Sequence, residues 1–166
     1  YFAVQTRRQE LSDEFGKFKS DEEKRLFLRQ QMKEHNRYLA SAAKEAGVVK
    51  PRDYAIFQDH GYRGLYGGLG QVDIHRHKGL KKGQKILDYM GSTELAANLF
   101  RATQTEDKLR RENIRGKDKA NQTHFEVGKK VRQTIKELGG TMPESLPSAE
   151  NIKKITSKNK KQVENK

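Results

Sequence analysis

The sequence predicts an all-α fold. No segment shows a sustained alternation of apolar and polar residues or a strand pair with a hairpin turn. Apolar residues instead recur at spacings of three and four, in segments that begin at capping residues and end at glycines. Apolar residues make up 33% of the chain and charged residues 34%, so we expect a small multi-helix domain with a thin core and wide solvated helix faces.

The first well-defined helix is expected between Ser20 and Gly47. Ser20 and Glu23 form a capping-box pattern, in which each side chain accepts a backbone N–H at the start of the helix. Gly47 suits the left-handed residue that ends a helix. Residues 1–11 resemble the end of a longer helix with no start signal, so we expect the chain to be a fragment whose upstream part is missing.

A glycine-rich segment follows a short helix that is predicted to begin at Pro51 and to stop at Gly61. Residues 61–70 contain five glycines interleaved with tyrosine and leucine. Glycine permits positive φ, whereas the large side chains argue against a flexible linker, so we predict a compact, ordered loop. Tyr62 and Tyr66 could stack on unpaired bases, but the favoured interpretation is that they anchor the loop to the core.

The remaining helices are expected over residues 72–77, 86–90, 92–112 and 118–138. Ser92 is expected to cap the third of these, and the glycine pair at 139–140 to end the fourth. The chain then becomes rich in Lys, Asn and Ser, a composition typical of a disordered tail or of one that becomes helical on binding. We therefore predict a helical domain over residues 1–145 and a basic, flexible tail over residues 146–166.

The charge balance points to an anionic partner. Thirty-five Lys and Arg against 22 Asp and Glu give a formal net charge of +13. The lysine- and glycine-rich residues 78–85 precede a helix start, and such backbone amides and cations can hold a nucleic-acid backbone without reading its sequence. An ordinary solvated turn is the alternative. The predicted binding residues are Arg63, Lys78, Lys81, Lys82, Lys85, Arg110, Arg111, Lys129, Arg132 and Lys136.

Several classes of chemistry lack their sequence signals. The absence of cysteine excludes disulfides, thiolate metal sites and a cysteine nucleophile, and there is no P-loop or zinc-protease motif. A metal-dependent nuclease built on Asp73, His75, His77 and His60 is an alternative, but two histidines two residues apart on a helix diverge by about 200° and no further ligand is evident. We expect a non-enzymatic protein with no metal and no cofactor.

The sequence also lacks the signals for a membrane protein. It has no apolar run long enough to span a bilayer and no signal peptide, so we expect a soluble, cytoplasmic protein.

Motifs along most of the chain carry a family resemblance. The most specific is GSTELAANLFRATQT at residues 91–105; others lie at residues 2–11, 23–29, 55–58, 60–62, 64–69, 78–82 and 139–143. In this order they resemble the C-terminal part of the DNA-damage-inducible protein D (DinD) family, whose members carry an additional N-terminal region similar to the DNA-binding half of viral BRO proteins. The resemblance implies a bacterial protein of the SOS response that is associated with the RecA recombinase, interferes with strand exchange and takes RecA filaments apart. It implies no catalytic residues.

Charge and resemblance together predict a non-enzymatic module that modulates homologous recombination through contact with RecA nucleoprotein filaments, DNA or both. The alternative is a structural or dimerisation domain that supports a missing N-terminal region. In that case the helix that starts at Ser20 or the one that starts at Ser92 would form a homodimer interface.

Overall fold

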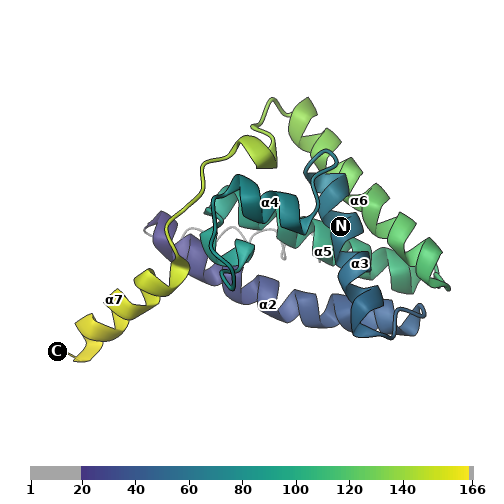
Figure 1. Ribbon diagram of the computed structural model, residues 1–166, viewed down its shortest axis with the longest axis horizontal. Coiled ribbons are helices and arrows are strands. Elements are labelled where there is room, and N and C mark those ends of the chain that lie inside the picture. The colour runs from purple at the N-terminus through teal and green to yellow at the C-terminus, as the bar shows by residue number, and fades with distance from the viewer. Residues whose placement is uncertain (1–19, 165–166) are drawn as a thin grey trace, which may run out of the picture.

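The computed structural model describes residues 20–164, and all its regular elements are helical (Figure 1). They are α2 (Asp21–Glu45), α3 (Pro51–Leu65), α4 (Gln71–His77), the 3-10 helix η1 (Ile86–Tyr89), α5 (Ser92–Arg111), α6 (Lys117–Glu137), the 3-10 helix η2 (Pro143–Ser145) and α7 (Ile152–Glu164). The predicted all-α class is confirmed. Within this region no helix has the length and apolar character needed to cross a membrane.

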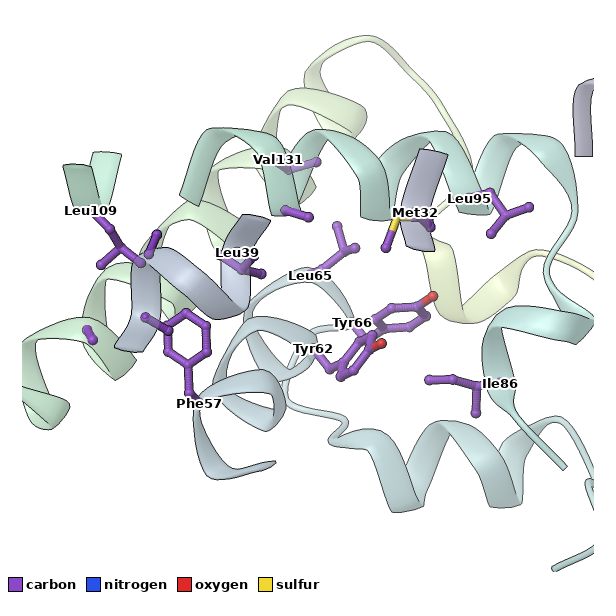
Figure 2. Close-up of a cluster of buried hydrophobic side chains, with 14 of the residues drawn as sticks. Met32, Leu39, Phe57, Tyr62, Leu65, Tyr66, Ile86, Leu95, Leu109 and Val131 are labelled. Atoms are coloured by element: carbon purple, nitrogen blue, oxygen red, sulfur yellow. The ribbon is translucent and has the colours of Figure 1, made fainter. Parts of the chain in front are cut away.

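The core lies between two helix pairs. Helix α2 packs along α5, α3 packs along α6, and a smaller contact between α5 and α6 joins the pairs. Figure 2 shows the buried side chains at their centre, including Met32, Phe57, Leu65 and Leu95. These apolar stripes are what the helical spacing in the sequence predicts.

Helix boundaries follow the predicted signals at α2 and differ at α5. The Ser20 hydroxyl accepts a hydrogen bond from the Glu23 amide at 3.2 Å, and Gly47 has φ +107°, as a helix-ending glycine should. At α5 the N-cap is Gly91. The Ser92 hydroxyl instead donates to the Asp21 carboxylate, which joins the first turns of α5 and α2, so the prediction that Ser92 caps its own helix was wrong.

The first half of the glycine-rich segment, residues 61–65, is helix, which corrects the predicted stop at Gly61. Helix α3 continues to Leu65, because Gly61 and Gly64 face α6 at very close range. A Cβ built on Gly64 would lie 2.2 Å from the Phe125 carbonyl oxygen, and one on Gly128 would lie 2.6 Å from the Gly61 carbonyl oxygen. These glycines therefore permit the backbones of two helices to touch. Gly61 and Gly64 were instead predicted from the sequence to be residues of a loop.

The ordered turn that remains is short and lies over residues 66–70. Gly67 and Gly68 adopt φ +65° and +104°, a region that only glycine occupies readily. The rings of Tyr62 and Tyr66 are buried in the core (Figure 2), where they anchor the end of α3 and present no free face for a base to stack on.

The C-terminal segment contains a helix where the sequence predicts a flexible tail. Ile152 and Ile155 are buried at the start of α7, which contacts α2 and η1. Ahead of the helix, Arg25 Nη2 donates to the Glu150 carbonyl oxygen at 2.7 Å. The segment has a low average hydrophobicity, but its two isoleucines lie three positions apart and give the helix one apolar side. An average over the segment does not detect this pattern. The helical character expected for residues 1–11 lies outside the described residues.

Candidate nucleic-acid interface and the buried polar network beneath it

Residues 78–85, which we call the lysine loop, connect α4 to η1 and form a defined turn. The Gln84 amide donates to the Lys81 carbonyl oxygen at 3.0 Å, and the Lys81 amide donates to Gln84 Oε1 at 2.7 Å. Nε2 of His75 lies 3.1 Å from the carbonyl oxygens of both Lys81 and Gln84, so a proton on this nitrogen can donate to the turn. His75 thus holds the lysine loop in shape.

Three lysines of this loop present their charge to solvent. Lys81, Lys82 and Lys85 are exposed, and none forms an ion pair with any residue in the described part of the chain. Gly79, with positive φ, precedes these lysines, and Gly83, also with positive φ, bends the backbone between Lys82 and Lys85. The predicted cationic loop is therefore present, with three exposed lysines that no carboxylate of the described residues neutralises.

Lys78 behaves differently from its neighbours. Its side chain is 5% exposed, and its Nζ lies 2.8 Å from Oε1 of Glu94, whose side chain is 1% exposed. Glu94 also accepts a short hydrogen bond from the Tyr66 hydroxyl, to which Asn98 Nδ2 donates at 3.0 Å. Lys78 is thus turned into the core and does not belong to the exposed surface to which the sequence analysis assigned it. Burial, followed by the negative charge of Glu94, raises the pKa of Tyr66 well above its usual value.

The polar network continues along α5 to α6. Arg101 is fully buried, with its guanidinium 4.8 Å from the centre of the Tyr62 ring and its Nη1 2.6 Å from Nε2 of His124. Nδ1 of His124 lies 2.8 Å from the Phe57 carbonyl oxygen. Because a carbonyl oxygen can only accept, Nδ1 carries the proton and Nε2 accepts from Arg101.

The network keeps His124 neutral. Burial lowers the pKa of His124 well below its usual value, and the positive charge of Arg101 lowers it further. This network was not among the features predicted from the sequence. A signal was available, because polar residues at positions 94, 98, 101 and 105 occupy the same helical stripe as the apolar residues of α5.

Most of the other predicted binding cations are paired with carboxylates. Arg110 contacts Glu45 at 3.1 Å and Glu106 at 3.5 Å, which places carboxylates beside a side chain predicted to be free. The remaining pairs are Arg63 with Asp59 at 2.8 Å, Arg111 with Asp107 at 3.1 Å and Arg132 with Glu144 at 2.7 Å. Partly neutralised arginines are weaker candidates for phosphate contact than the lysine loop.

Three of the predicted binding residues, Lys129, Arg132 and Lys136, share one face of α6 and form a basic stripe that is interrupted at its centre. Lys129 and Lys136 are exposed and form no ion pair within residues 20–158. Arg132 lies between them in sequence, but both of its terminal nitrogens donate to the Glu144 carboxylate, at 2.7 Å each. These hydrogen bonds raise the pKa of Arg132.

The histidines considered for a metal site do not converge. In the part of the chain that the structure describes, no group of three or more His, Cys, Asp or Glu side chains is placed to hold a metal ion. His75 contacts the lysine loop, His77 Nε2 lies 2.8 Å from the Glu144 carbonyl oxygen, and His60 Nδ1 lies 2.8 Å from the Ile56 carbonyl oxygen.

Comparison with known proteins identifies the relatives of this chain. The family described as the DinD C-terminal domain matches residues 19–155, from the cap of α2 to the first turn of α7. The DNA damage-inducible protein D of Escherichia coli strain K12 is 64% identical over 167 residues, which cover 95% of this chain and 61% of that protein. The chain thus spans about three fifths of this relative, and no solved structure gives a significant match. The chain belongs to the DinD family and carries its C-terminal domain.

Proposed function

We propose that this domain acts in the DNA-damage response by binding, without catalysis, to the RecA nucleoprotein filament and its DNA, and thereby modulates homologous recombination. The observation that carries the proposal is the lysine loop, in which Lys81, Lys82 and Lys85 are exposed and unpaired on a turn held by His75. The name of the E. coli relative supports a role after DNA damage.

The chemistry of the loop suits a phosphate backbone. Lysine ammonium groups are mobile point charges that neutralise phosphates without requiring a particular base. The exposed aromatic platforms that would stack unpaired bases are missing at Tyr62 and Tyr66, whose rings are buried. Contact should therefore be electrostatic and independent of base sequence.

A charge-reversal variant tests the proposal. The triple variant Lys81→Glu, Lys82→Glu, Lys85→Glu should weaken binding to labelled single-stranded DNA coated with RecA by at least about tenfold, because each of three cations becomes repulsive. Fluorescence anisotropy at fixed salt, on naked DNA and on the RecA-coated strand, separates recognition of DNA from recognition of the filament.

A matched variant controls for net charge. Arg37→Glu, Lys44→Glu and Lys50→Glu alter total charge equally, at exposed residues without ion pairs in the described region, near the junction of α2 and α3. This variant should retain most of the binding, and circular dichroism should show equal helicity for both. Equal loss in the two variants would show that net charge alone governs binding. Retained binding by a folded lysine-loop variant would remove this loop from the mechanism.

A further inference from the structure

Helices α5 and α6 diverge from the short connection that joins them (Figure 1). Residues of both helices line two adjoining depressions, which together form a groove between them. The end farther from this connection is an apolar depression of about 380 Å³. Small side chains, Ala96 and Ala97, form one wall, and Ile135 and Leu138 form the other. Phe100 is 48% exposed and Leu138 81% exposed, which leaves large apolar surface without cover from the described residues.

The other end of the same groove is basic. A second depression, of about 450 Å³, lies between the later turns of α5 and the middle of α6 and shares Phe100, Val131 and Thr134 with the first. Its rim carries Lys108, Arg111 and Lys130, with Glu126 as the only acidic residue of the lining. Lys130 forms no ion pair among the described residues.

The dimensions fit a helix. From Thr93 to Arg111 the groove follows 19 residues of α5, and their separation at about 1.5 Å per residue is roughly 27 Å. An amphipathic helix of similar length can place apolar residues spaced by three and four along such a groove. Phe100 would lie at the centre of the contact, where both depressions meet.

The positive charges at the rim of the groove indicate which kind of partner can bind there. A second copy of this chain carries the same net charge of +13, so the two copies would repel each other as they approach. A nucleic acid would gain nothing from the apolar end. Carboxylates on a partner helix could instead exchange with the solvent-exposed pairs that Lys108 and Arg111 make with Glu112 and Asp107, which are worth little in water.

We propose that the α5–α6 groove is a docking site for an acidic amphipathic helix of a partner protein. Its apolar residues would occupy the end between Ala96 and Leu138, and its carboxylates would lie against the rim of Lys108, Arg111 and Lys130. This interface shares no lining residue with the lysine loop, so it adds a protein contact to the proposed nucleic-acid contact and can be tested separately.

A designed peptide provides the probe. A fluorescein-labelled peptide of about eighteen residues, with Leu and Phe along one helical face and Glu elsewhere, should bind the full chain. A scrambled peptide of the same composition, which keeps the charge but loses the apolar face, should bind at least about tenfold more weakly. The variant Phe100→Ser with Leu138→Ser should lose most affinity for the ordered peptide, and Lys130→Glu should weaken it severalfold.

The control variant Val49→Ser with Val72→Ser removes two other exposed apolar side chains and should bind as the parent does. Equal binding of ordered and scrambled peptides, no binding of either, or equal affinity of the Phe100/Leu138 variant would each overturn the proposal. So would sedimentation showing a dimer that this variant dissociates, because the groove would then be covered by a second copy.

Discussion

Several ionisable side chains of this domain are buried in its core. Glu94, Arg101 and Lys78 lie together in the interior, and each is hydrogen-bonded within the network described above. A buried charge is tolerable when it is paired and its remaining donors or acceptors are satisfied, and it becomes costly when one partner is removed. The network therefore makes particular residues critical for stability without giving them a role in binding.

Lys78 illustrates this distinction. Lys78→Met leaves the Glu94 carboxylate buried without its cation and should reduce the free energy of unfolding by about 3–5 kcal/mol, as measured by urea denaturation. Adding Glu94→Gln should recover a large part of the loss, because the uncompensated charge is removed. Lys82→Met, at an exposed position, should change stability by less than about 0.5 kcal/mol. A Lys78→Met loss as small as that of Lys82→Met would mean that the pair contributes nothing.

His124 predicts a loss of stability in mild acid. Its pKa is lowered in the folded state, so below about pH 6.5 the unfolded chain binds a proton that the folded chain does not. Stability should therefore decrease as pH falls from about 7 to 5, with a slope that approaches 1.4 kcal/mol per pH unit. Unfolding by urea at several pH values in this window measures the slope.

The variant His124→Gln should have a lower stability at pH 7 and a shallower pH dependence. Glu144 does not disturb this measurement, because the window from pH 7 to 5 lies above the ordinary pKa of a glutamate. In the folded state the pKa of Glu144 is lowered further: burial opposes this shift, but hydrogen bonds from Arg132 outweigh it. NMR gives an independent readout, because the His124 ring signal of the folded parent should not titrate between pH 7 and 5. A titration midpoint near 6.5 would contradict the buried, neutral assignment.

At the scale of elements, local signals predicted helix ends wherever the governing interaction is local. Ser20 and Gly47 bound α2 as expected, because a capping hydroxyl and a left-handed glycine act within one turn. Gly61 and Ser92 were misassigned because their roles depend on a distant helix: Gly61 on α6, and Ser92 on the start of α2. The buried position of Lys78 was missed for the same reason, since its partner Glu94 follows sixteen residues later.

The crossing of α3 and α6 should tolerate no side chain at its closest point. In an unpacked helix, replacing glycine by alanine stabilises by roughly 1 kcal/mol, but a Cβ on Gly128 would meet the backbones of Gly61 and Leu65 at 2.6 and 2.9 Å. Because both obstructions are backbone atoms, the steric cost should win, and Gly128→Ala should destabilise by about 2 kcal/mol or more in thermal or urea unfolding. Gly91→Ala, with no atom within 4 Å of the added carbon, is the control. A stabilised Gly128→Ala would mean that the two helices are not in backbone contact.

Over the whole molecule, the cations sort into those that carboxylates neutralise and those that are left unpaired. Carboxylates accompany Arg63, Arg110, Arg111 and Arg132. Within the described region, the cations without an ion pair include Lys81, Lys82 and Lys85 of the lysine loop, Lys129, Lys130 and Lys136 of α6, and Arg37, Lys44 and Lys50 near the junction of α2 and α3. Composition predicted an anionic partner but could not predict this sorting, because the pairs of Arg110 with Glu45 and of Arg132 with Glu144 form only when helices and loops assemble. Among the unpaired cations, those of the lysine loop and Lys129 and Lys136 of α6 belong to the predicted binding residues, and they give two candidate phosphate-contact surfaces.

Salt dependence can decide which surface neutralises phosphates. For single-stranded DNA, each neutralised phosphate contributes about 0.7 to the slope of the logarithm of the binding constant against that of the salt concentration. Lys81→Gln, Lys82→Gln, Lys85→Gln should therefore lower the magnitude of the slope by about 2, if all three lysines contact phosphates. Lys129→Gln with Lys136→Gln should leave the slope nearly unchanged, because Arg132, which would complete that stripe, is held by Glu144. A reduced slope in the α6 variant together with an unchanged slope in the loop variant would show that α6, and not the lysine loop, contacts the phosphates. The slope can make this distinction because it reports the number of phosphates neutralised by cations anywhere on the protein.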